Sequence, residues 1–74
     1  MKRRKSTPDL PPLGSNVQMR FGIKQVIAVV IEHRGPLGVG GRELIRVRFQ
    51  FEGANEPIET EVPVDEVTVV DPAA

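Results

Sequence analysis

The chain has 74 residues with one histidine and no cysteine, which limits the chemistry that it can perform. A catalytic histidine needs a nucleophile or an orienting carboxylate, and a metal site needs several ligands. His33 ends an apolar run, whereas Ser6 and Ser15 lie in or beside a proline-rich N-terminus. We therefore expect a surface histidine, and no catalytic residue, metal or cofactor. An enzyme built on a single carboxylate or lysine stays an open alternative.

Glycines and carboxylates are numerous, but neither set has the pattern of a phosphate site or a catalytic pair. The run 35–41 superficially resembles a phosphate-binding loop, but a strand pattern follows it where such loops have a helix N-terminus. Glu59 and Glu61 point to the same side of a strand pattern, beside Arg46 and Arg48. This arrangement predicts a solvated ladder of charges and not two catalytic carboxylates with divergent pKa values.

The formal net charge is zero, but the charges are unevenly distributed. Lys2, Arg3, Arg4 and Lys5 open the chain, and three prolines follow them. Charge and proline together predict a basic, proline-rich, disordered tail over residues 1–15. No apolar run approaches the ~20 residues of a membrane span. Small secreted domains usually contain disulfides, so we expect a cytoplasmic protein without a membrane partner.

The rest of the chain, residues 16–71, reads as five short strands without a helix. Alternating or β-branched apolar residues predict strands over residues 17–21, 43–51, 56–62 and 67–70. Consecutive apolar residues over 26–33 predict a long strand that is buried on both sides or bends between two sheets. Pro63 ends the fourth strand, and residues 64–66 suit a single 3₁₀ turn before the last strand.

Charge and hydrophobicity together predict how the strands 43–51 and 56–62 pair. If Phe49 faces Ile58, then Arg48 faces Glu59, so apolar groups pair inside and opposite charges pair outside. A slip of one residue would break both patterns, so this register is well specified. The inward residues form the predicted core, which comprises Val17, Met19, Phe21, Val26, Ala28, Val30, Ile45, Val47, Phe49, Ile58, Val62, Val67 and Val69.

The hairpin between residues 26–33 and 43–51 leaves an apolar surface without an explanation. Placing His33 opposite Arg42 pairs the inward residues and puts Val29 opposite Arg46. Either the surface is an interface, including one between two copies in a homodimer, or the strand bends and turns part of it inward. The apolar residues left outside, here called the outer stripe, are Ile27, Val29, Ile31 and Leu44.

From about residue 16 to 71 the strand pattern resembles an SH3-like small β-barrel. The matching features are the long second strand, the loop-separated third strand and the turn at 63–66 before the last strand. The resemblance implies an all-β, five-stranded barrel whose long strand is shared by two sheets. The ligand motifs of such barrels are missing: the Tyr and Trp of proline-binding SH3 grooves, the Tudor aromatic cage and the basic first hairpin of the KOW type. The run RGPLGVGGRELIRVRF is also similar to that of short bacterial proteins, a resemblance that implies no function.

These observations predict a non-enzymatic protein-interaction module or small accessory subunit whose partner is another protein. Its candidate surface is the outer stripe together with Leu37 and Val39 of the glycine-rich loop. The alternative is a KOW-like nucleic-acid-binding accessory protein, since phosphate contacts need lysine and arginine. The acidic neighbours of the strand arginines favour the protein partner. The candidate nucleic-acid-binding residues are Lys2, Arg3, Arg4, Lys5, Arg34, Arg42, Arg46 and Arg48.

Overall fold

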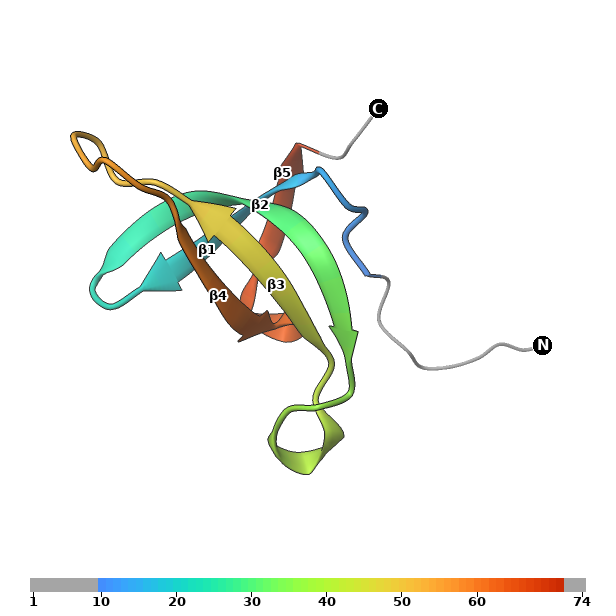
Figure 1. Cartoon of the computed structure of the whole chain (residues 1–74). Coiled ribbons are helices and arrows are strands. Elements are labelled where there is room, and N and C mark those ends of the chain that lie inside the picture. Colours follow the sequence, from blue (N-terminus) through green and yellow to red (C-terminus); the bar gives the residue numbers. More distant parts are fainter. Residues whose placement is uncertain (1–9, 72–74) are drawn as a thin grey trace.

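The computed structural model describes residues 10–71, which form antiparallel strands, two single 3₁₀ turns and no α-helix (Figure 1). The predicted all-β class with five strands is confirmed. None of these residues belongs to a helix that is long and apolar enough to cross a membrane. The elements are β1 (Asn16–Phe21), β2 (Lys24–Gly35), η1 (Val39–Gly41), β3 (Leu44–Phe49), β4 (Ile58–Pro63), η2 (Val64–Glu66) and β5 (Thr68–Asp71).

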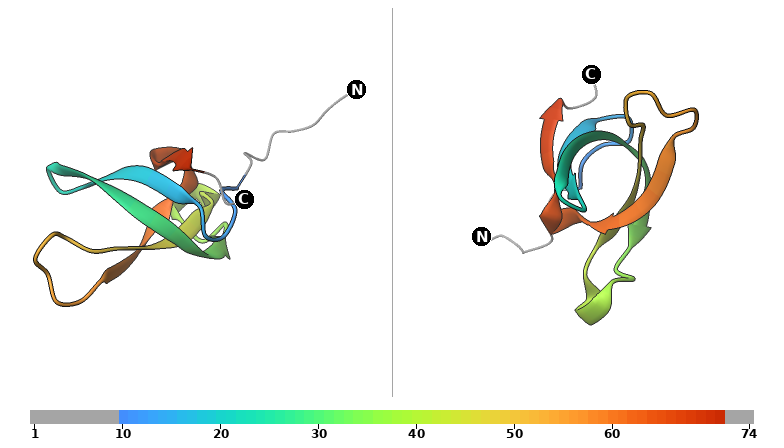
Figure 2. Two further views of the ribbon diagram at one scale, coloured as in Figure 1. Left: turned by 90° about the horizontal axis from the view of Figure 1, so that it is seen from above. Right: turned by 90° about the vertical axis from the view of Figure 1, so that its left-hand side faces the viewer.

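All five strands lie in one sheet, in the order β4-β3-β2-β1-β5. The 12-residue β2 pairs with β1 along its first half and with β3 from Val29 onward. Figure 2 shows that the sheet curls, so that the strands on either side of β2 turn toward each other. Within residues 10–71 no pairing joins β4 to β5, so both remain edge strands.

A two-residue turn connects β1 to β2. Phe21 pairs with Lys24, which leaves Gly22 and Ile23 as the turn. Gly22 has a φ of 64°, the left-handed conformation that tight hairpin turns require and that glycine adopts without a steric cost.

The core lies inside the curl of the sheet, and most of it was predicted from the alternation of apolar residues. Phe21 and Val69 are exceptions, because each remains more than a third exposed. Phe21 ends its strand at the turn, and Val69 lies on an edge strand with one neighbour. Val64 of η2 is buried but was not predicted, since alternation does not extend through a 3₁₀ turn. The buried apolar residues are Val17, Met19, Ala28, Val30, Ile45, Val47, Phe49 and Val64, with Val26, Ile58, Val62 and Val67 packed against them.

The predicted register between β3 and β4 is confirmed. Phe49 faces Ile58, and Arg48 faces Glu59. The register between β2 and β3 was predicted wrongly, because the ladder shifts between Val30 and Glu32 and again between His33 and Gly35. Extra residues at such shifts bend the strand. His33 therefore faces Ile45, and Val29 faces Arg48 in place of the expected Arg46.

Residues 10–15 pack against the sheet, which corrects the prediction of a disordered tail for this part. Gly14 N donates to Val30 O at 2.8 Å, and Val30 N donates to Ser15 O at 3.0 Å. Ser15 is fully buried, and Leu10 contacts the core. The segment covers the part of β2 that extends beyond its pairing with β1, which explains why these residues are held. Residues 1–9 of the predicted tail lie outside the described residues.

Candidate functional surfaces

A ladder of paired charges covers the outer face of β3 and β4. Glu59 is shared by two arginines: its Oε2 lies 3.2 Å from Arg48 Nε, and its Oε1 lies 3.4 Å from Arg46 Nε. Arg34, at the end of β2, donates from Nε to Glu61 Oε2 at 2.7 Å. Each of these arginines therefore has a carboxylate of its own chain, with which any phosphate would have to compete.

Arg42 is also paired, and its contacts tie two loops together. Its Nη2 lies 2.6 Å from Asp65 Oδ1 and 3.0 Å from Glu66 Oε2, both in η2. These hydrogen bonds, with Asp65 the larger cause, raise the pKa of the Arg42 guanidinium above its ordinary value. Hydrogen bonding and charge from Glu32 raise the pKa of Arg34 in the same way. The strand and loop arginines of the candidate nucleic-acid surface are thus neutralised. The rest of that surface lies outside the described residues, namely Lys2, Arg3, Arg4 and Lys5.

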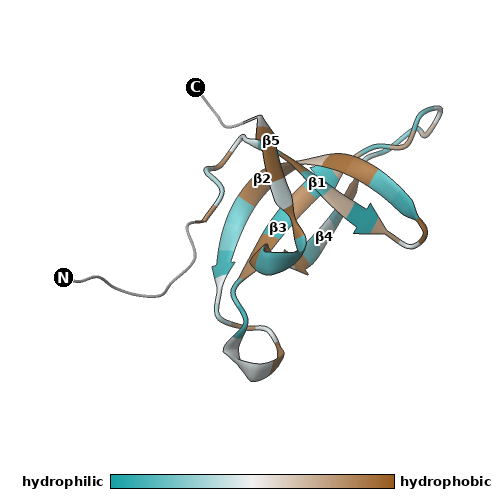
Figure 3. Ribbon diagram, turned by 180° about the vertical axis from the view of Figure 1, so that it is seen from behind, coloured by the Kyte–Doolittle hydropathy of each residue, from teal (hydrophilic) through white to brown (hydrophobic). Residues whose placement is uncertain are grey.

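The connection between β2 and β3, residues 36–43, is a compact loop that projects from the sheet (Figure 3). Gly38 N donates to Arg42 O, and Gly41 N donates to Gly38 O, both at 2.9 Å. A Cβ on Gly38 would lie 3.0 Å from Arg42 Cβ and 3.1 Å from Leu44 Cδ2, so only glycine fits without displacing its neighbours. Together with the contacts of Arg42 to η2, these interactions fix the loop on the body.

The loop presents two large apolar side chains to solvent. Leu37 is 66% exposed and Val39 is 91% exposed. Both belong to the surface predicted to bind protein. They lie beyond the end of β2 and therefore apart from the middle of the outer stripe.

The structure divides the outer stripe. Ile27 is 54% exposed and Val29 is 37% exposed, and both lie on the outer side of β2. Ile31 and Leu44 are half-buried. Ile31 stands where the β2–β3 register shifts, and Leu44 Cδ2 lies against the loop at Gly38. The stripe is therefore reduced to two adjacent exposed positions, and the loop forms a second, separate apolar surface.

His33 has a structural partner. Its Nε2 lies 2.7 Å from the Pro11 carbonyl oxygen, which accepts the hydrogen bond. The contact joins the N-terminal segment to β2. Among residues 10–71, no group of three or more histidine, cysteine or acidic residues could hold a metal ion.

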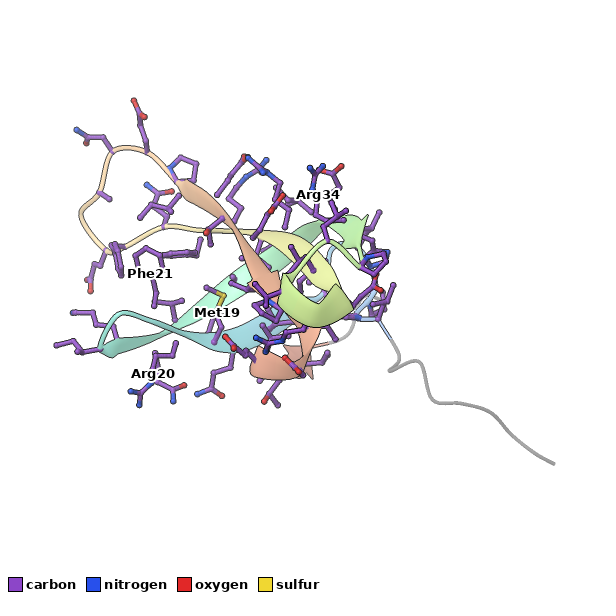
Figure 4. All side chains as sticks on the ribbon, turned by 90° about the horizontal axis from the view of Figure 1, so that it is seen from below. Met19, Arg20, Phe21 and Arg34 are labelled. Carbon is purple, nitrogen blue, oxygen red and sulfur yellow. The ribbon has the colours of Figure 1, made fainter. Side chains whose placement is uncertain are left out.

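A further surface was not expected from the sequence, and we call it the open end: the β1–β2 tip, residues 20–24, and the β3–β4 connection, residues 50–57. Phe21 lies between these two arms, and Arg20 points away from that space (Figure 4). The Phe21 ring centroid lies 4.9 Å from that of Phe49 and 6.1 Å from that of Phe51. Phe21 is nevertheless 38% exposed, and Ile23 at the turn is 92% exposed. The sequence could have indicated this exposure, because Phe21 directly precedes the glycine of the turn and therefore ends its strand.

Comparison with known proteins identifies no relative. The chain matches no protein-family model, no curated protein and no solved structure. The function must therefore be inferred from the surfaces of the chain itself.

Proposed function

We propose that this chain is a non-enzymatic protein-interaction module, or small accessory subunit, built on an SH3-like barrel. Three features support the barrel: the strand order β4-β3-β2-β1-β5, the long β2 that serves both halves of the sheet, and the 3₁₀ turn directly before β5. In this proposal the edges of β4 and β5 approach each other to complete the barrel.

The observation that carries the proposal is the fixed exposure of Leu37 and Val39. Apolar side chains that remain in water are costly to hydrate, and burying one is worth roughly 1.5–3 kcal/mol. A mobile loop could turn such side chains inward, but this loop is held by its own hydrogen bonds and by the ion pairs of Arg42. Rigidly presented apolar residues on a loop are typical of a surface that inserts into a pocket of another protein.

The pairing of the arginines supports a protein partner over the nucleic-acid alternative. Arg34, Arg42, Arg46 and Arg48 all lie within 4.0 Å of a carboxylate. Nucleic-acid affinity depends mainly on cations that are free to contact phosphates. Binding through these four residues would require breaking ion pairs that the chain already makes.

The test uses the full chain and the double variant Leu37→Asp/Val39→Asp. Both side chains lie in solvent, so the variant folds, and circular dichroism checks this. We expect the proteins that crosslink to the wild-type chain in cells to be lost from the variant. Leu13→Asp is the matched control, because Leu13 is also an exposed leucine but lies outside the loop, and it keeps those partners.

Two results would contradict the proposal. One is an unchanged set of crosslinked partners in the loop variant. The other is sub-micromolar binding of a fluorescently labelled oligonucleotide that weakens strongly between low and high salt, which would favour the nucleic-acid alternative.

A further inference from the structure

Charged side chains without an ion-pair partner are concentrated at the open end. Of the Asp, Glu, Lys and Arg side chains that the structure describes, most take part in the ion pairs of β2, β3, β4 and η2. Arg20 and Lys24 of the β1–β2 tip make no such pair, and neither do Glu52 and Glu56 of the β3–β4 connection. Glu43, near the opposite end of β3, is the remaining unpaired side chain of this kind.

The two arms of the open end carry opposite charge. The tip of the β1–β2 hairpin holds the two cations, and the β3–β4 connection holds the two carboxylates. Figure 2 shows the arms at the same end of the molecule, splayed from each other. No ion pair within 4.0 Å joins them among the described side chains, and all four charged residues are exposed to solvent.

Apolar groups accompany the charges at this end. Ile23 stands at the apex of the basic arm and is almost fully exposed. Phe21, between the arms, keeps part of its ring in solvent although it contacts Phe49 and Phe51. A partner that covered the open end would therefore bury apolar surface at the centre and pair charges around it, which is the usual composition of a protein interface.

We propose that the open end binds the open end of a second copy of this chain in a two-fold symmetric dimer. A half-turn about an axis in the plane of the interface, perpendicular to the line that joins the two arms, brings the two open ends face to face and places each arm opposite the other kind of arm. The basic tip of each copy then faces the acidic connection of the other, and both contacts are identical, as a two-fold interface requires. Arg20 and Lys24 thereby gain the carboxylate partners that they lack in the single chain.

Charge complementarity distinguishes this surface from the outer stripe. Of the exposed residues of the stripe, Val29 faces Arg48, which Glu59 already neutralises, and Ile27 faces the uncharged Gln18. The inference is also independent of the proposed binding loop, because Leu37 and Val39 lie at the other end of β2. Failure of one proposal therefore leaves the other intact.

The test is sedimentation of the full chain at micromolar concentrations, with two charge-reversal variants. Arg20→Glu/Lys24→Glu makes both arms acidic, and Glu52→Lys/Glu56→Lys makes both arms basic. Exposed ion pairs are individually weak, so the wild-type dimer is expected to form in the micromolar range and to weaken with salt. Each variant alone is expected to self-associate at least about tenfold more weakly, since every contact becomes repulsive.

An equimolar mixture of the two variants supplies the decisive measurement. In the mixed dimer the acidic tip of the first variant meets the basic connection of the second variant. The basic tip of the second variant meets the acidic connection of the first, so association is restored. Loss of folding cannot produce this recovery. Glu43→Lys is the matched control, because it reverses an unpaired charge away from the open end and leaves dimerisation unchanged.

Three outcomes would overturn the proposal. The first is a wild-type chain that sediments as a monomer at high micromolar concentration. The second is a dimer that both charge-reversal variants leave intact. Loss of the dimer in the folded variant Ile27→Asp counts in the same way, because it would place the interface at the outer stripe. The third is a monomer whose salt-sensitive binding of a labelled oligonucleotide disappears in Arg20→Glu/Lys24→Glu, which would assign this end to nucleic acid.

Discussion

Replacing Ser15 by alanine tests whether residues 10–15 contribute to the stability of the fold. The Ser15 hydroxyl donates to the Pro12 carbonyl oxygen, and the side chain is fully buried. The Ser15 backbone N–H donates to the same oxygen at 3.1 Å, so Ser15→Ala leaves that acceptor with one partner. The loss is therefore that of an ordinary hydrogen bond, about 1 kcal/mol, and not the larger penalty of an unsatisfied buried group.

A loss of this size is measurable in so small a protein. Urea unfolding followed by circular dichroism should show a lower midpoint with an unchanged slope, because the surface exposed on unfolding stays the same. The melting temperature should fall by about 4–8 °C.

Leu13→Ala is the control for this experiment. Leu13 lies in the same segment, but more than half of its side chain is exposed. Its replacement should change the free energy of unfolding by less than about 0.5 kcal/mol. Equal effects of Ser15→Ala and Leu13→Ala would refute the reasoning, because residues 10–15 would then behave as a tail despite their contacts in the structure.

Three further predictions concern the core, the loop and the charge ladder. Ile45→Ala should cost about 2–5 kcal/mol in denaturant unfolding, since Ile45 is fully buried, and the exposed Ile27→Ala should cost far less. Gly38→Ala should cost about 1–3 kcal/mol, because the new Cβ would lie 3.0 Å from Arg42 Cβ and from its carbonyl oxygen; an unchanged stability would show that the loop is loose. Glu59→Gln should lower stability by at most about 1 kcal/mol at low salt and by less at high salt, and a loss independent of salt would contradict the ion-pair explanation.

The β3–β4 hairpin could be predicted in detail because both of its faces carry information. The inner face alternates apolar residues, and the outer face alternates opposite charges, as in Arg46 facing Glu61 and Arg48 facing Glu59. Only one register satisfies both faces, and the structure adopts it.

The β2–β3 pairing could not be predicted in the same way. Consecutive apolar residues from Val26 to Ile31 give no alternation that fixes which side chain points inward. The ladder shifts beyond Val30, where the pairing of β2 with β1 ends. The amino-acid composition of the strand does not indicate where such a shift occurs. The division of the outer stripe, and with it the separation of Val29 from Leu37 and Val39, follows from this bend.

The N-terminal segment shows a different limit of sequence reasoning. Pro11 and Pro12 argue against strand pairing, and they do not pair as a strand. The segment is instead held by single contacts to β2: Gly14 N to Val30 O, and His33 Nε2 to the Pro11 carbonyl oxygen. Both partners are distant in sequence, and nothing in the composition of the segment points to them.

The two kinds of arginine in this chain illustrate how strand register determines the role of a charge. Arg48 and Arg20 both lie on the outer side of a strand in an alternating pattern. Arg48 faces Glu59 across β4, so its charge is used within the fold. Arg20 faces Gln25 across β2, a neutral residue that leaves the guanidinium without a carboxylate. A formal net charge of zero therefore conceals a neutralised sheet and an open end where opposite charges stand apart, and it is there that the structure has charge available for a partner.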